Sequence, residues 1–124
     1  MKERDLYRTM PKPDETCLWE LKLCKTKSIP FAALKPHQKD ALLTSKIIGT
    51  WYKFPDTGVQ QMPCDGFYIK KAEVAYVIVL FYEPRKKKDF YFIEIEDWVS
   101  ERERSKSLTK ARAEEICRYK KSSK

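Results

Sequence analysis

Histidine and closely spaced cysteine pairs are scarce in this chain, and their scarcity excludes the commonest zinc-binding domains. The 124 residues contain one histidine and four cysteines, and no two cysteines form a C-x-x-C pair. Zinc fingers and zinc ribbons need such pairs or a histidine cluster. Cys17 and Cys24 fall on opposite faces of a predicted strand, so they are poorly placed to bond to each other. We expect all four thiols to be reduced and mainly structural.

Long apolar runs are also missing. No stretch is long enough to span a bilayer, and the charged N-terminal residues do not resemble a signal peptide. The sequence therefore predicts a cytoplasmic protein with no membrane partner. Its length suits one domain, and hydrophobic and aromatic contents of 42% and 13% are typical of a folded globular chain.

Positive charge is in excess. Twenty-six lysines and arginines outnumber 18 acidic residues, which gives a formal net charge of +8 and a pI near 9.3. Such a balance favours an anionic partner, most often nucleic acid, with a membrane surface as the weaker alternative.

The hydrophobic pattern predicts an α/β sandwich with a central mixed β-sheet flanked by helices. Residues 1–13 are expected to form an N-terminal arm or short helix, 14–95 the sheet and core, and 96–124 a helical C-terminal part of the single domain 1–124. A helix should begin near Pro36 and stop near Gly49. The continuous apolar run 74–82 predicts a central strand, forming a hairpin with the strand 89–95. Short strands are expected at 51–54 and 64–69, and helices at 96–105 and 109–120.

The strand around Glu20-Leu21-Lys22 has an unusual polar face. Trp19 and Leu23 share an apolar face with Leu21, while Glu20 and Lys22 lie together on the other face. An acid and a lysine in an otherwise hydrophobic strand are either solvated or paired structurally, or form part of a metal-dependent site. Hydrolysis of a phosphodiester suits the second interpretation, because a cation held by carboxylates and a strand carbonyl activates water, and a lysine stabilises the developing charge.

Pro13-Asp14 followed by Glu20-Leu21-Lys22 spells the motif that names the PD-(D/E)XK nuclease superfamily. The residues beyond it, Ser28-Ile29-Pro30-Phe31, His37-Gln38, Pro63-Cys64-Asp65-Gly66-Phe67 and Lys106-Ser107-Leu108-Thr109, are similar in order to phage-type and Gram-positive Holliday-junction resolvases over about residues 14 to 116. The resemblance implies a restriction-endonuclease-like fold and a homodimer that cuts branched DNA in recombination with Mg²⁺, or Mn²⁺. It would place a phage-encoded chain in the host cytoplasm. It also implies that Glu20 and the Leu21 carbonyl bind the metal, that Lys22 is catalytic, and that Gln38 leans over the site.

The second carboxylate is left open by the sequence. Asp14 lies six positions before Glu20, which places their backbones about 20 Å apart in a straight strand. Only a sharp bend would bring Asp14 to the metal. Asp65 is therefore an alternative second metal ligand, provided that its strand packs near the first strand. Asp65 can equally be a turn residue. An acidic residue from an earlier helix, expected from the resemblance, could only be Glu3 or Asp5.

Several further residues are predicted to contact DNA phosphates, and they are Lys25, Lys27, Ser28, His37, Arg85, Lys86, Lys87 and Lys88. His37 can equally be a surface or capping residue, and Gln38 can merely satisfy a backbone group. Three functions remain open: a junction-resolving nuclease, a less specific nuclease for duplex or flap DNA, and an inactive nucleic-acid-binding module.

Overall fold

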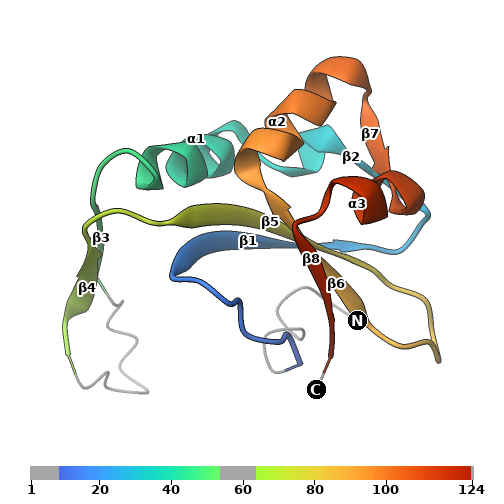
Figure 1. The fold of residues 1–124 in the computed structure, drawn as a ribbon, viewed down its shortest axis with the longest axis horizontal. Coiled ribbons are helices and arrows are strands. Elements are labelled where there is room, and N and C mark those ends of the chain that lie inside the picture. Colours follow the sequence, from blue (N-terminus) through green and yellow to red (C-terminus); the bar gives the residue numbers. More distant parts are fainter. Residues whose placement is uncertain (1–8, 54–63, 124) are drawn as a thin grey trace.

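The structure, a computed structural model, describes residues 9–53 and 64–123. Its centre is a four-stranded mixed sheet in the order β1-β5-β6-β8 (Figure 1). The strands are β1 (Cys17–Cys24), β5 (Val74–Phe81), β6 (Asp89–Glu94) and β8 (Tyr119–Ser122). β1 runs parallel to β5, whereas β6 is antiparallel to both β5 and β8.

Three helices lie on one face of this sheet, as Figure 1 shows: α1 (Pro36–Ser45), α2 (Ile95–Arg104) and α3 (Lys110–Ile116). Alternate residues of β5, including Val77 and Val79, pack beneath them with Leu34 and Trp98. The remaining residues of β5 form a second buried cluster on the opposite face, so all eight residues of this strand are buried. No helix in the described part of the chain is long and apolar enough to cross a membrane.

Two small two-stranded sheets complete the described fold. In one, β2 (Ser28–Pro30) pairs with β7 (Ser107–Thr109), and a 3-10 helix (Phe31–Ala33) follows β2. In the other, β3 (Thr50–Lys53) pairs with β4 (Gly66–Ile69) to form a ribbon at one end of the molecule (Figure 1). Gly66 permits close approach of the two strands, because an added Cβ would lie 2.1 Å from the Tyr52 carbonyl oxygen.

The mixed α/β architecture and the order of its first elements are confirmed. The predicted helix at Pro36, the buried central strand, its antiparallel hairpin partner and the helix near 96–105 are all present. The helix predicted at 109–120 is too long: α3 ends at Ile116, and Tyr119–Ser122 form the sheet strand β8. The expected helix within 1–13 falls largely on residues 1–8, which lie outside the described residues.

Candidate functional site

Strand β1 lies at one edge of the central sheet and presents Glu20 and Lys22 to the face covered by helices. In the parallel register, Glu20 is opposite Val77 and Lys22 is opposite Val79, and both valines belong to the core beneath the helices. The apolar residues between and beside them pack on the other face, as strand alternation predicts.

Lys22 is nearly buried and pairs with one acid among the described residues. The residue is 8% exposed, and its Nζ lies 3.4 Å from Oε1 of Glu20. Withdrawing a charge from water is costly unless an opposite charge accompanies it, so this lysine depends on its strand neighbour. The side chain of Glu20 is 31% exposed, which leaves the carboxylate accessible to solvent. Lys22 is therefore a positive charge held in place beside the solvent-accessible carboxylate of Glu20.

Gln38 joins the pair from the first turn of α1. Its Nε2 donates a hydrogen bond to Oε1 of Glu20 at 3.1 Å, while its Oε1 accepts one from the backbone N–H of Lys35 at 3.0 Å. Since the carboxamide oxygen already accepts this backbone N–H, the amino end must point toward the carboxylate. The helix start thereby fixes the orientation of Glu20.

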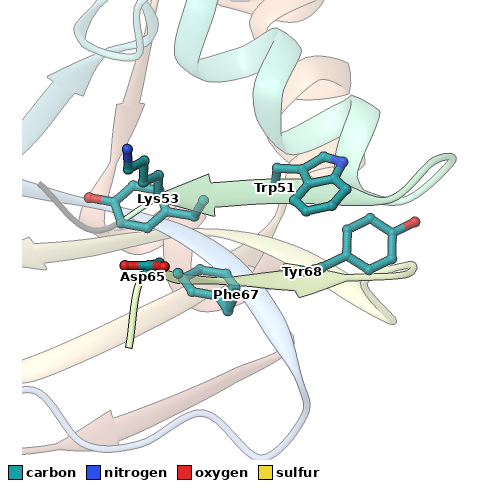
Figure 2. Close-up of a pocket in the computed structure, with 7 residues that line it drawn as sticks. Trp51, Lys53, Asp65, Phe67 and Tyr68 are labelled. Carbon is teal, nitrogen blue, oxygen red and sulfur yellow. The ribbon is translucent and has the colours of Figure 1, made fainter. Parts of the chain in front are cut away.

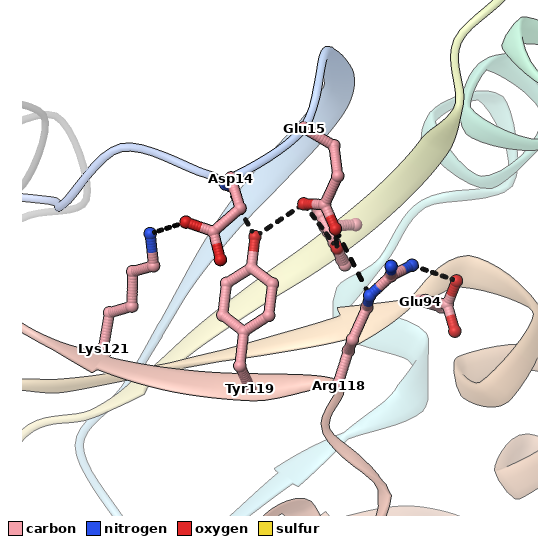
Figure 3. Close-up of polar contacts among 7 residues, drawn as sticks. Asp14, Glu15, Glu94, Arg118, Tyr119 and Lys121 are labelled. Carbon is pink, nitrogen blue, oxygen red and sulfur yellow. Dashed lines mark hydrogen bonds and ion pairs between the residues drawn. The ribbon is translucent and has the colours of Figure 1, made fainter.

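Asp14 does not reach this site. Its carboxylate pairs with Lys121 of β8 at 2.5 Å, and its backbone N–H donates to the hydroxyl of Tyr119 at 3.0 Å (Figure 3). Tyr119 packs with the cluster on the sheet face opposite to Glu20. The prediction of Asp14 as a metal ligand beside Glu20 is therefore wrong, because the chain before β1 crosses to the other face of the sheet.

Asp65 is also distant in the fold. The expectation that its strand packs beside the first strand is wrong, because β4 pairs with β3 in the separate ribbon and β1 pairs with β5. Asp65 is exposed immediately before β4 and lines a shallow pocket with Lys53 and Phe67 (Figure 2). The proposed alternatives Glu3 and Asp5 lie outside the described residues.

The lysines predicted to contact phosphate gather at the end of the sheet where β1 and β5 finish. Lys27 and Ser28 line one shallow pocket there, and Lys86 and Lys87 line its neighbour; Glu83 and Lys110 line both. Lys86 above all, and then Lys110 and Lys27, hold the pKa of Glu83 below its usual value. Lys110 was missed from the sequence, because only the β2–β7 pairing brings the start of α3 to this end.

The other predicted contacts do not line these two pockets. Arg85 lies in the β5–β6 turn with a left-handed φ of 65°, and Lys88 follows in the same connection. Lys25 is exposed directly after β1, three residues beyond Lys22. His37 is exposed on α1 next to Gln38.

A partly buried polar network on the other face of the sheet was also missed. Both Glu15 carboxylate oxygens accept hydrogen bonds from the hydroxyl of Tyr76 at 2.9 Å, and one of them accepts from Tyr119 at 2.8 Å. Arg118 Nε lies 3.2 Å from the same carboxylate and also pairs with Glu94 (Figure 3). Burial, with the two hydrogen-bonding partners, raises the pKa of Tyr76. The sequence signal was weak, since Tyr76 and Arg118 are 42 positions apart in a chain rich in both residue types.

The donors around Glu20 are the minimum that magnesium accepts. Mg²⁺ keeps several waters and can be held by one or two carboxylates together with substrate phosphates. The donor that the structure shows there is the partly exposed carboxylate of Glu20; Leu21, whose carbonyl the resemblance implies as a second ligand, belongs to the same strand, whose outer edge has no strand partner within the described residues. Residues 9–53 and 64–123 contain no group of three or more acidic, histidine or cysteine side chains placed to hold a metal. Water molecules or a bound anion would fill the remaining positions around a cation at Glu20.

Comparison of the chain with protein-family models, with curated proteins and with solved structures found no match.

Proposed function

We propose that this chain is a magnesium-dependent endonuclease that hydrolyses phosphodiester bonds in branched DNA, such as a Holliday junction. The observation that carries the proposal is the convergence of Lys22, Glu20 and Gln38, in which a nearly buried ammonium group lies beside an accessible, oriented carboxylate. The resemblance to PD-(D/E)XK resolvases supports the same activity and a restriction-endonuclease-like version of the mixed sheet.

Each residue of the site has a distinct proposed role. Glu20 and the Leu21 carbonyl would hold the metal, and Gln38 is a positioning residue that keeps the Glu20 carboxylate turned toward it. Lys22 places its positive charge where a scissile phosphate would develop negative charge, and such fixed charges stabilise transition states best in partly desolvated sites. When bound, Mg²⁺ offsets phosphate charge and lowers the pKa of a water molecule.

The lysines at the end of β1 and in the β5–β6 turn would bind the DNA backbone. These contacts carry no sequence information, so binding should weaken as salt rises. Resolution of a junction needs two symmetric cuts, and we therefore propose a homodimer with two sites. A less specific nuclease acting on duplex or flap DNA would use the same three residues.

A second function, DNA binding without catalysis, is favoured by one specific observation. Asp14 and Asp65, the two described carboxylates predicted to join Glu20, both lie elsewhere, which leaves one acid to hold a metal. For such a protein, the Lys22–Glu20 pair is structural and the basic end of the sheet carries the whole function.

Cleavage of a four-way junction and of a matched linear duplex in Mg²⁺ separates these functions, with wild-type protein compared with Lys22→Ala. We expect wild type to nick the junction, and Lys22→Ala to bind it without nicking. If the junction and the linear duplex are cut equally, the chain is a nuclease without a preference for junctions. Metal-independent binding by both proteins with no nicking would establish the inactive module.

A further inference from the structure

The β3–β4 ribbon has an unusual surface. All the large hydrophobic side chains that are exposed in the described residues lie on it or just before it: Ile47, Ile48, Trp51, Tyr52, Phe67 and Tyr68. The four aromatic residues among them line one shallow pocket of the ribbon (Figure 2). Soluble monomers rarely gather exposed apolar residues in one place, and such patches mark interaction surfaces.

Trp51 and Tyr68 are the most accessible of these rings. They are opposite each other in the antiparallel register, with ring centroids 5.1 Å apart and an angle of 49° between the rings. The Tyr68 ring also lies against Gly49, where an added Cβ would overlap it. Trp51 is nevertheless 82% exposed and Tyr68 54% exposed. Since aromatic rings normally contribute to a fold by leaving water, two rings that stay in water present their surface to a flat ligand.

The charge around these rings is positive. Within two residues of either strand, the described chain carries three lysines, Lys53, Lys70 and Lys71, and one acid, Asp65. All four side chains are exposed, and none of the three lysines pairs with an acid in the part of the chain that the structure describes. The acid precedes the start of β4, whereas two of the lysines directly follow its end. Stacking rings beside unpaired cations fit an anionic ligand that carries flat aromatic groups.

Nucleic acid with unpaired bases has this chemistry. Proteins that bind single strands combine a positively charged surface for the phosphates with aromatic side chains on which successive bases stack. In a duplex the bases stack on one another, so their faces are not available to a protein ring. Exposed rings therefore select bases that are unpaired.

We propose that Trp51 and Tyr68 form a stacking platform for unpaired bases of single-stranded DNA, whose phosphates bind Lys53, Lys70 and Lys71. The platform is separate from the lysines of the β5–β6 turn, because the ribbon precedes the start of β5 and the turn follows its end, at the other end of the molecule (Figure 1). The choice of DNA rather than RNA rests on the proposed function. Stacking itself involves no metal and no cleavage of a bond.

Fluorescence anisotropy of labelled oligothymidylate, about 12 nucleotides long, tests the platform in EDTA, where a metal-dependent nuclease cannot cut. We expect Trp51→Ala to weaken this binding at least about tenfold, because the stacking of a base is lost. Binding of a blunt duplex of the same length should change less than about twofold, because it depends on phosphate contacts. Ile47→Ala is the matched control, since Ile47 is 75% exposed just before the ribbon and has no ring. It should change neither affinity by more than about twofold.

Intrinsic fluorescence of the same mixtures reports stacking directly. Trp51 is 82% exposed, whereas Trp98 is fully buried, so oligothymidylate should quench mainly the emission of Trp51. Trp51→Phe keeps a ring and should bind within about threefold of wild type, but should lose the quenching. Lys53→Gln should reduce the slope of log affinity against log salt concentration by about 0.7, the value for one phosphate contact of a single strand. Circular dichroism must show that each variant is folded.

Wild-type protein that does not bind oligothymidylate at about 100 μM would overturn the proposal, as would equal losses of affinity in Trp51→Ala and Ile47→Ala. If Trp51→Ala weakens the single strand and the duplex equally, the ribbon is a general DNA contact and the platform is wrong. Tighter Trp51-dependent binding of oligouridylate would overturn the choice of DNA.

The binding test and the cleavage test can fail separately. A protein that binds oligothymidylate through Trp51 but never nicks a junction in Mg²⁺ would keep the platform and lose the proposed nuclease. A protein that nicks a junction but binds oligothymidylate equally well after Trp51→Ala would keep the nuclease and lose the platform.

Discussion

Two glutamates near the start of the first long strand, Glu15 and Glu20, show how differently one protein can use the same side chain. Glu15 accepts hydrogen bonds from two tyrosines and pairs with Arg118, and its side chain is 14% exposed. Glu20 has one amide donor and one ammonium group, and it is about twice as exposed. Three donor groups occupy both oxygens of the Glu15 carboxylate, whereas both donors of Glu20 meet the same oxygen, Oε1, so Glu20 keeps more capacity for a ligand.

We interpret this difference as the one between a structural carboxylate, Glu15, and the carboxylate of the proposed site, Glu20. Buried polar groups with filled hydrogen-bonding capacity stabilise a fold, while accessible charges held in place by the protein more often bind or react. Substitutions at Glu20, Glu15, Gln38 and Tyr76 test the difference, and their expected effects decrease in that order.

If the proposed function is right, Glu20→Gln should reduce cleavage of a four-way junction at least about a hundredfold, because the isosteric amide removes the carboxylate that we propose as metal ligand. Its midpoint of urea unfolding should fall, because the nearly buried Lys22 loses the anion beside it and keeps only a neutral amide, so cleavage is compared under conditions where both proteins are folded. Single-turnover cleavage and urea titration of the same preparation check both. An unfolded Glu20→Gln protein would make Glu20 structural.

Glu15→Ala should lower the stability of the fold and leave cleavage unchanged. Two tyrosine hydroxyls and a guanidinium would lose their acceptor, and the free energy of unfolding should fall by about 2 kcal/mol. Cleavage per folded molecule should be unchanged at a temperature where the variant is folded. Chemical denaturation measures the loss, with the exposed Glu103→Ala as the control. A full loss of cleavage in folded Glu15→Ala would contradict the purely structural role of Glu15.

Gln38→Ala should reduce the rate of cleavage about tenfold, since it removes the hydrogen bond that orients Glu20 and leaves the carboxylate itself. If Gln38 acts by positioning, Gln38→Ala should also raise the Mg²⁺ concentration needed for half-maximal rate. His37→Ala, the neighbouring exposed change on α1, should leave that concentration unaltered. If Gln38→Ala and His37→Ala need the same Mg²⁺ concentration for half-maximal rate, Gln38 serves only as a helix-capping residue.

The smallest effect should appear at alkaline pH. Burial raises the pKa of Tyr76 in the folded protein above its ordinary value near 10. The folded state therefore keeps this proton more tightly, so its contribution is fully present below about pH 10 and is lost as pH rises further. Tyr76→Phe should flatten the decline of the unfolding free energy above pH 10, measured by urea titration at several pH values. An unchanged slope would show that Tyr76 contributes nothing to this decline.

The sequence by itself determined the pattern within β1 and the identity of the central strand. Alternation placed Glu20 with Lys22, and the unbroken apolar run of β5 predicted a strand buried on both faces. Helix-start chemistry at Pro36 put Gln38 in the first turn of α1. These features are local, because they follow from side-chain period and backbone preference within a few residues.

Only the tertiary structure decided which distant residues meet. It turned the segment before β1 to the opposite face, so that Asp14 pairs with Lys121, and it placed Asp65 on a ribbon outside the central sheet. It also used the basic C-terminal residues as strand β8, against their helical pattern. Such choices depend on the pairing of strands far apart in the chain, which the residues of one segment do not encode.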